Sequence, residues 1–519
     1  MSRNIVLVTL APKTHRTSEE NLGLGYLKAV LVEANYNVKI IDGWLNELTV
    51  DEVYNQIMEV ENPLFVGLSS YMSNTLPAIN LINKLKQTNP QLTIVCGGFG
   101  PTFYPIEHLN NGADIVVRGE GEKVIVNLAK CLEAKSDLLN VKGIYYKDSQ
   151  GKIIQTELEP LVDDLDILPF PSRDTLNVVL DKKSTVDILT ARGCSGNCQF
   201  CSVIAFFRLN KGKVWRTRSI KNIVDEIESL YKQGVRHIKV VDDSFVDGIR
   251  DEQWCQEFAD EINKRNIKVQ LRGQIRADKI TDKILYHLKR AGFFSFACGI
   301  ENGSETALKR MNKKATIEDN KRALELFKKH DYIVQMGYIL FDKDTTLQEL
   351  EENYEFLKKH DFTVTKGIFS EMYSAEGTQL TNQLRSSNEL IESDFINNNN
   401  KYIIVDETVR KVYDALKYWH KNHSEIYDKT IDPITAPKAI PLEEIRKFYE
   451  YALKLKNKDL EIFKLLLETI NEDKNANLMA IIEEQINHNQ KFYECIEEEV
   501  NRLYEQNELK YNASKNPFI

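Results

Sequence analysis

The chain has 519 residues, of which 42% are hydrophobic and 28% are charged, and its formal net charge is -9 at pH 7. This length exceeds what one hydrophobic core normally serves, and the balanced composition is not that of a disordered chain, so we expect a multidomain globular protein. The acidic balance argues against a nucleic-acid backbone as the main partner, because neutralising phosphates requires a concentrated basic face.

The longest apolar runs are only strand-sized, as in residues 5–10 and 64–68. A membrane-spanning helix needs about 20 apolar residues, so we expect no membrane partner. The N-terminal run has no small-residue cleavage site, which argues against a secretory signal. We therefore expect a cytoplasmic protein. In a reducing compartment, a tight cysteine cluster indicates a metal or redox site before a disulfide framework.

Residues 1–140 alternate short apolar runs with amphipathic stretches. Strands are expected at 5–10, 38–41, 64–69, 93–96 and 115–117, and helices at 24–34, 50–59 and 76–87. Such alternation predicts an α/β fold, a doubly wound, Rossmann-like parallel sheet, whose ligands bind beyond the carboxyl ends of the strands. The loops at those ends contain Ser69, Gly97, Gly98 and Glu120. Their small residues would let a flat ligand approach the backbone.

Residues 141–185 lose this periodicity and contain Pro169 and Pro171, so we expect a linker there. Residues 186–376 again alternate strand-like runs with helical stretches, which predicts a partial (β/α)6 barrel. The active site of such a barrel is expected at the carboxyl ends of its strands. Its strands are expected near 187–191, 237–241, 268–272, 294–299, 332–340 and 363–369. Residues 377–519 carry mostly helical spacing and form a C-terminal extension.

A cysteine motif follows the first strand of the expected barrel. Cys194, Cys198 and Cys201 have the spacing C-x-x-x-C-x-x-C, which lets three thiolates hold one cubane cluster and leaves one iron open. A zinc knuckle is the alternative, but no fourth Cys or His follows at finger-like spacing. The sequence therefore predicts an iron–sulfur site whose open iron can chelate a substrate or cofactor.

This motif resembles that of the radical S-adenosylmethionine (SAM) superfamily, and its surroundings resemble the cobalamin-binding branch. The resemblance implies a [4Fe-4S] cluster that chelates SAM and cleaves it reductively to a 5′-deoxyadenosyl radical. It also implies that Phe200, just before the third cysteine, packs near the adenine. Simple core packing of Phe200 is the alternative.

Three further segments resemble SAM-binding motifs of the family. Asp243, in 241–245, resembles the acidic strand end that handles the SAM amino group, and Glu301, in 299–304, resembles the motif that reaches the ribose. Arg216 resembles a basic residue that could meet the SAM carboxylate, although a solvated position at a helix start is an equal alternative. Residues 337–342 lack the Gly-x-x-Gly-Glu run of relatives, which leaves the adenine contacts there open.

Residues 1–140 resemble the cobalamin-binding domain of these enzymes through 21–27, Gly97-Gly98 and 118–122. The resemblance implies that Ser69, Gly97, Gly98 and Glu120 contact cobalamin. The chain departs from many cobalamin proteins because the Asp-x-His-x-x-Gly signature is absent, so we expect His15 to be a loop residue and not a cobalt ligand. A domain that serves only as a lid is the alternative.

The resemblance implies hydrogen abstraction and methyl transfer to an unactivated carbon of a small-molecule or peptide substrate. It also implies an electron donor such as flavodoxin or ferredoxin. Radical rearrangement or cyclisation without methyl transfer remains open, as does a redox-sensing iron–sulfur protein. A tRNA methylthiolating enzyme would carry another N-terminal domain and a basic RNA-binding module, and neither is evident in the sequence.

Overall fold

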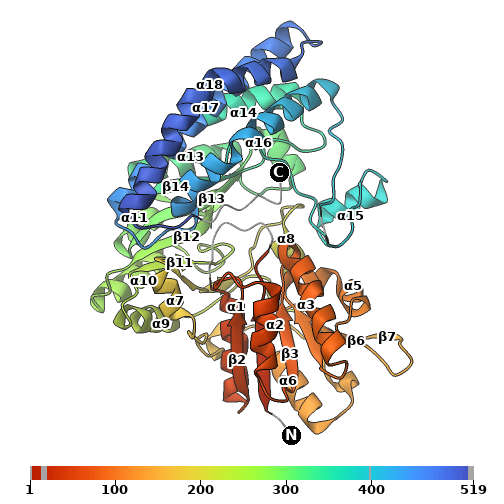
Figure 1. The fold of residues 1–519 in the computed structure, drawn as a ribbon. Coiled ribbons are helices and arrows are strands. Elements are labelled where there is room, and N and C mark those ends of the chain that lie inside the picture. The colour runs from red at the N-terminus through yellow and green to blue at the C-terminus, as the bar shows by residue number, and fades with distance from the viewer. Residues whose placement is uncertain (1–2, 13–19, 397–398, 512–519) are drawn as a thin grey trace.

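The structure of the protein is a computed structural model, and it describes residues 3–12, 20–396 and 399–511. His15 lies outside the described residues, so the expectation about it is not addressed. The chain forms an N-terminal sheet domain, a barrel-like sheet with helices around it, and a group of long C-terminal helices (Figure 1). None of the described helices is both long and apolar enough to cross a membrane.

The N-terminal domain is built on a seven-stranded sheet in the order β2-β1-β3-β4-β5-β6-β7. Its parallel strands are β1 (Asn4–Thr9), β2 (Asn37–Asp42), β3 (Phe65–Ser69), β4 (Ile94–Gly97) and β5 (Ile115–Val117). The accompanying helices are α1 (Leu22–Glu33), α2 (Val50–Met58), α3 (Thr75–Thr88), α4 (Phe99–Phe103), α5 (Pro105–Asn110) and α6 (Glu122–Ala134). Two separate hydrophobic clusters cover the two faces of the sheet, which confirms the expected doubly wound architecture.

The segment expected to be a linker begins instead with two strands of the same sheet. β6 (Ile144–Lys147) pairs antiparallel with β5, and β7 (Ile153–Gln155) pairs antiparallel with β6. Ile144, Tyr145 and Tyr146 are buried against the domain core, which explains why these residues join the sheet. The sheet therefore continues to residue 155, and irregular chain with the short helix α7 (Leu176–Asp181) leads to the barrel.

The second sheet has five parallel strands in the order β14-β13-β12-β11-β8. They are β8 (Val186–Ile188), β11 (His237–Val240), β12 (Gln270–Arg276), β13 (Phe293–Glu301) and β14 (Ile333–Tyr338). The expected sixth strand at 363–369 is not a regular strand, since only isolated bridges join Gln335 to Val364 and Phe341 to Glu371. Gly367, at a φ of 85°, interrupts the extended backbone that a strand requires.

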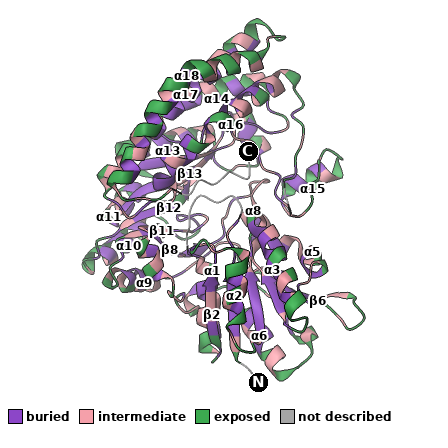
Figure 2. Cartoon of the chain, in the orientation of Figure 1, coloured by how far each residue is buried: buried purple, intermediate pink, exposed green. Residues whose placement is uncertain are grey.

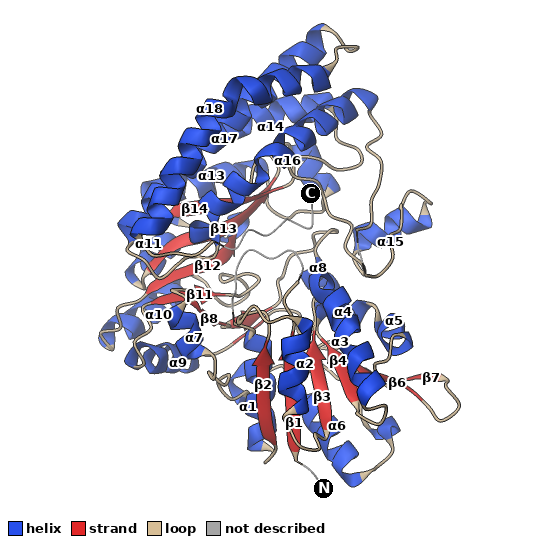
Figure 3. Ribbon diagram, viewed as in Figure 1, coloured by secondary structure: helices blue, strands red, loops and turns tan. Residues whose placement is uncertain are grey.

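The barrel helices follow from amphipathic sequence. In α9 (Ile220–Lys232), the buried residues include Ile223, Ile227 and Leu230, which recur at helical spacing, and Ser219 caps the helix by accepting from the Asn222 amide. The other helices are α10 (Glu252–Lys264), α11 (Asp282–Arg290), α12 (Glu305–Arg310), α13 (Ile317–Lys329) and α14 (Leu347–Lys359). Their apolar sides cover one face of the sheet (Figure 3).

Three long helices form most of the C-terminal region: α16 (Glu407–Thr435), α17 (Leu442–Glu472) and α18 (Leu478–Gln506). Trp419, Phe448 and Phe463 are completely buried in the same hydrophobic cluster as the barrel core. Figure 2 shows buried residues along these helices next to exposed ones. The short helix α15 (Gln379–Ser386) lies apart from them, near the N-terminal domain (Figure 1). The expected helical extension is therefore continuous with the barrel core.

Candidate functional site

The three motif cysteines lie on one loop after the first barrel strand. The loop follows the short strand β9 (Ala191–Arg192) and ends at α8 (Ser202–Phe207), and all three thiols are partly exposed. Gly193 starts the loop at a φ of 79°, and a Cβ there would lie 2.0 Å from the Val214 carbonyl oxygen. Only glycine therefore allows this turn, which directs the chain into the cysteine motif.

Charged groups surround the cysteine loop. Arg276 donates from Nη1 to Sγ of Cys194 at 3.6 Å and to Oγ of Ser195 at 3.2 Å. Burial raises the pKa of Cys198, and it raises the pKa of Cys201 to about 11. Binding to metal would hold such thiols deprotonated. Among the described residues, no three Cys, His, Asp or Glu side chains form a site for a single metal ion. A cubane cluster does not need three side chains around one ion, because each thiolate binds a different iron.

The two acids expected near SAM both lie close to this loop. Asp243 accepts from the Gly193 amide at 3.0 Å, and burial raises its pKa to about 6. Glu301 accepts from Lys313 at 2.7 Å, and both groups act electrostatically on Cys198. Glu301 has a φ of 66°, which is unusual for a residue with a side chain and is typical of functional sites. The structure therefore brings both acids to the cysteine motif.

Phe200 packs in a small apolar cluster with Met311, Met372, Leu380 and Leu384. These residues come from the end of α12, the segment after Phe369, and α15. These contacts are the ones expected if Phe200 simply packs in the core. An adenine contact of Phe200 stays a prediction.

A cavity of about 510 Å³ lies between the N-terminal domain and the barrel. Its lining includes five of the expected cofactor contacts, namely Ser69, Gly97, Gly98, Glu120 and Asp243. The first four come from the carboxyl ends of β3, β4 and β5, as the parallel topology requires, and the fifth comes from the end of β11. One cavity therefore joins the loops of the first sheet to the acid beside the cysteine motif.

Aromatic side chains line one side of this cavity. Trp44 contacts Tyr71 edge to face, Tyr71 stacks on Phe99, and Phe99 stacks on Phe206 with 4.4 Å between ring centroids. Phe99 belongs to α4 and Phe206 to α8, so this pair joins the two domains. The sequence reasoning missed these residues, although the Phe206-Phe207 doublet soon after the third cysteine was a visible signal.

The glycines of the cavity show how closely a ligand could approach the backbone. Gly98 has a φ of 99°, and a Cβ there would lie 2.6 Å from the Ser70 carbonyl oxygen. At Gly97 the nearest neighbour of an added Cβ would be Val117 at 3.7 Å, which is an ordinary contact. The apolar walls and this bare backbone fit a large flat ligand such as a corrin ring.

Buried ion pairs fix the N-terminal domain to the barrel. Glu120 accepts from Arg192 and from Arg216, each at 2.9 Å, and Glu122 accepts from Arg192. Arg216 also donates to the Val162 carbonyl oxygen, and only 1% of its side chain is exposed. These contacts pair two residues that were expected to bind different cofactors. The contact of Arg216 with SAM stays a prediction, and its hydrogen bonds favour a role in domain docking.

Sequence reasoning missed three charged residues at the site: Arg192, Arg276 and Lys313. Arg192 immediately precedes the motif loop, and the other two come from the end of β12 and the loop after α12. The proximity of Arg276 and Lys313 depends on which strands are neighbours in the barrel, so no local signal in the sequence could identify these two. Arg192 stands just before Cys194, and that position was a local signal.

Two protein families match the chain. The radical SAM superfamily matches residues 188–357, and the B12 binding domain matches residues 13–129. An uncharacterized methyltransferase of Pyrococcus horikoshii is 30% identical over 319 residues, which cover 60% of this chain and 67% of that protein. The anaerobic magnesium-protoporphyrin IX monomethyl ester cyclase of Rubrivivax gelatinosus is 31% identical over 330 residues, which cover 61% of this chain and 57% of that protein.

Two solved structures share the fold. The cobalamin-dependent SAM radical enzyme OxsB with aqua-cobalamin bound has a TM-score of 0.76 at 20% identity, covering 97% of this chain and 80% of its own. The radical SAM methyltransferase TsrM from Kitasatospora setae, with cobalamin and a [4Fe-4S] cluster, has a TM-score of 0.64 at 18% identity, covering 76% of each chain. The chain belongs to the cobalamin-binding radical SAM enzymes. Its cofactors are a [4Fe-4S] cluster, SAM and cobalamin.

Proposed function

We propose that the chain is a methyltransferase that adds a methyl group to an unactivated carbon of a small-molecule or peptide substrate. The observation that carries this proposal is the shared cavity, since Gly97 and Gly98 of the N-terminal domain and Asp243 of the barrel line the same space. A methyl carrier held by the first sheet would face the site where SAM is cleaved. Methyl transfer needs this proximity.

In this proposal, Cys194, Cys198 and Cys201 hold the cluster, and Asp243 and Glu301 bind the amino group and ribose of SAM. Ser69, Gly97 and Gly98 hold cobalamin within residues 1–140, and residues 186–376 form the SAM domain. When bound, the reduced cluster supplies the electron that cleaves SAM, and cobalamin carries the methyl group. The chain itself orients the groups and excludes water, with Phe99 and Phe206 closing one side of the cavity.

An electron donor such as flavodoxin or ferredoxin reduces the cluster in this account.

Cyclisation or rearrangement without methyl transfer is the second candidate function. It is supported by the 31% identity of the chain to a protein named as a cyclase. The two differ in their products. Methyl transfer with a radical step consumes two SAM molecules, giving S-adenosylhomocysteine and 5′-deoxyadenosine, whereas the second candidate gives no S-adenosylhomocysteine.

The test is anaerobic turnover of the fully loaded enzyme with deuterated methyl-SAM and candidate substrates. Mass spectrometry should find both SAM products and a labelled substrate. Formation of 5′-deoxyadenosine with an unlabelled, rearranged product would support the second candidate instead. A Cys198→Ala variant serves as the control for cluster-independent SAM breakdown.

A further inference from the structure

Tyr26 of α1 lines the interdomain cavity together with Gly97 and Gly98. Only 4% of its surface is exposed, and no described residue forms a hydrogen bond with its hydroxyl. The oxygen is not among the fully enclosed polar atoms of the described chain, so it keeps contact with the cavity that the ring lines. Buried tyrosine hydroxyls usually find a partner, so this one requires an explanation.

The Tyr26 hydroxyl is a hydrogen-bond donor at neutral pH. Burial raises the pKa of Tyr26 to about 12, so the phenol keeps its proton. Two acids of the cavity are already engaged, since Glu120 and Glu122 both accept from Arg192. The hydroxyl therefore offers its proton to a bound group and not to the wall of the cavity.

Contacts on two sides fix the Tyr26 side chain in place. The guanidinium of Arg192 lies over the ring, with Cζ 5.6 Å from the ring centroid. The neighbouring residue Gly25 accepts from the Ser172 amide at 3.0 Å, and a Cβ at Gly25 would lie 2.8 Å from the Ser172 carbonyl oxygen. Helix α1 is thus packed closely against the segment that leads to the barrel. A side chain held in this way loses little freedom when a ligand binds.

The position of Tyr26 favours cobalamin as the partner of its hydroxyl. Tyr26 lies within residues 13–129, which match the B12 binding domain, and it shares the cavity with the glycine loop of β4. A largely apolar cavity orients its ligand through a few placed polar groups. The corrin ring is rimmed by amide side chains, whose carbonyl oxygens accept hydrogen bonds. Such a carbonyl is the acceptor that suits a buried phenol.

We propose that the hydroxyl of Tyr26 donates a hydrogen bond to an amide carbonyl at the edge of the corrin ring and so fixes the orientation of cobalamin in the cavity. This inference rests on the proposed function, because it needs cobalamin in the space that Asp243 also lines. Arg192, which covers the Tyr26 ring, stands two residues before Cys194. The same contact therefore sets the position of the corrin relative to the cysteine motif.

The test measures the affinity of the full-length, cluster-loaded protein for hydroxocobalamin by anaerobic absorbance titration. Tyr26→Phe should weaken binding by about fivefold, which corresponds to the loss of one neutral hydrogen bond. The affinity for SAM in the same preparations should not change. The urea midpoint of the cobalamin-free protein should also stay the same, because the variant removes a hydroxyl that has no partner in the described part of the chain.

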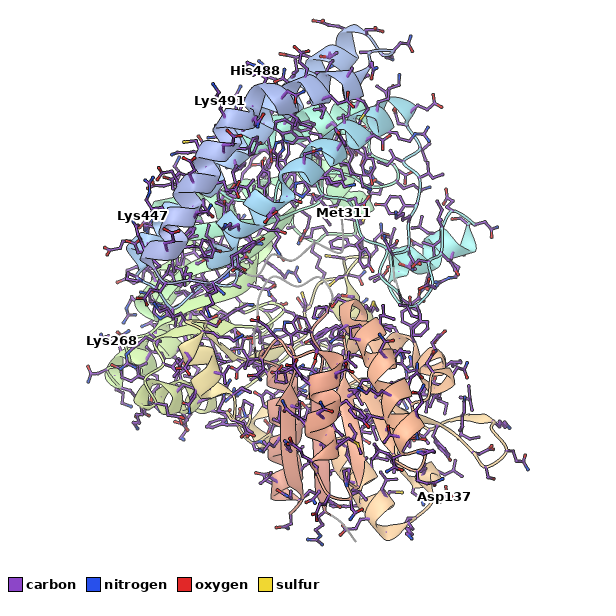
Figure 4. The ribbon with its side chains drawn as sticks, in the orientation of Figure 1. Asp137, Lys268, Met311, Lys447, His488 and Lys491 are labelled. Carbon is purple, nitrogen blue, oxygen red and sulfur yellow. The ribbon has the colours of Figure 1, made fainter. Side chains whose placement is uncertain are left out.

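Tyr36→Phe is the matched control, because it removes a hydroxyl that is already paired within the same domain. Tyr36 is 5% exposed, and its hydroxyl donates to Glu133 at 2.9 Å. Glu133 precedes by four residues Asp137, which lies at the end of the domain far from the barrel (Figure 4). Tyr36→Phe should therefore lower the urea midpoint and leave the affinity for hydroxocobalamin unchanged.

Equal affinities of Tyr26→Phe and the wild type for hydroxocobalamin would overturn the inference alone, and so would equal losses in Tyr26→Phe and Tyr36→Phe. A wild-type protein that binds no hydroxocobalamin would overturn the inference and the proposed function together. Weaker binding by Tyr26→Phe, with no S-adenosylhomocysteine formed by the wild type during turnover, would support the inference and contradict methyl transfer.

Discussion

Arg276 donates to the sulfur of Cys194 at 3.6 Å, and a salt bridge of 2.8 Å with Asp278 holds its guanidinium in place. A cation beside a ligating sulfur stabilises the more negative, reduced state of a cluster. We therefore expect Arg276, which lies outside the cysteine motif, to make the cluster easier to reduce.

The first prediction is that Arg276→Met lowers the reduction potential of the cluster. The expected shift is about 60 mV, the equivalent of tenfold in a one-electron equilibrium. Potentiometric titration followed by electron paramagnetic resonance measures it. Arg276→Lys, which keeps a cation, should shift the potential less, and an unchanged potential in Arg276→Met would show that the contact has no electronic effect.

The second prediction separates the two adjacent glycines of the cavity. Gly98→Ala should lose cobalamin, because a Cβ would meet the Ser70 carbonyl oxygen at 2.6 Å and the backbone has a φ of 99°. Gly97→Ala should lose less cobalamin than Gly98→Ala, since its Cβ would make only an ordinary contact with Val117. The absorption spectrum of anaerobically purified protein reports bound cobalamin. Equal retention by both variants would contradict the role of the Gly98 backbone.

The third prediction concerns the docking of the two domains. Glu120→Gln should lower the free energy of unfolding by about 3 kcal/mol, because Arg192 and Arg216 would lose the carboxylate they share in a buried position. Chemical denaturation measures the change. Lys142→Gln is the control, since its ion pair with Glu157 is exposed. If Glu120→Gln weakened SAM binding with no loss of stability, Arg216 would instead serve the SAM site.

The fourth prediction concerns pH and the C-terminal helices. Burial raises the pKa of Asp459 to about 6, although Trp419 donates to it at 2.8 Å. Between about pH 4 and about 6, the folded chain holds a proton that the unfolded chain releases, so this residue lowers the free energy of unfolding as pH rises. Asp459→Asn should flatten that part of the pH profile in urea denaturation. An unchanged slope would show that Asp459 ionises normally.

The sequence predicted most of the first sheet because its strands are short apolar runs and its helices are amphipathic. It failed at Ile144–Lys147 and Ile153–Gln155, which form two short strands. The prolines farther along the chain led to the prediction of a linker there. Strands this short gain stability only by joining an existing sheet, which the local sequence does not reveal. At 363–369 the apolar pattern predicted a strand, and the left-handed conformation of Gly367 interrupts it.

The candidate site was predictable where its residues follow strand ends, as for Asp243 and Glu301. It was not predictable where residues meet only through the tertiary fold. The pairing of Glu120 with Arg216 joins positions 96 residues apart, and the contact of Arg276 with Cys194 joins positions 82 residues apart. No local pattern encodes such contacts, since they depend on strand order and on the docking of the two domains.

The central claim is that one cavity brings a methyl carrier to the site of SAM cleavage. Its most direct test is a quantitative count of products after anaerobic turnover with a substrate and deuterated methyl-SAM. The account predicts S-adenosylhomocysteine and 5′-deoxyadenosine in equal amounts, together with a substrate that carries the label. Formation of 5′-deoxyadenosine without S-adenosylhomocysteine, by enzyme that retains both the cluster and cobalamin, would contradict it.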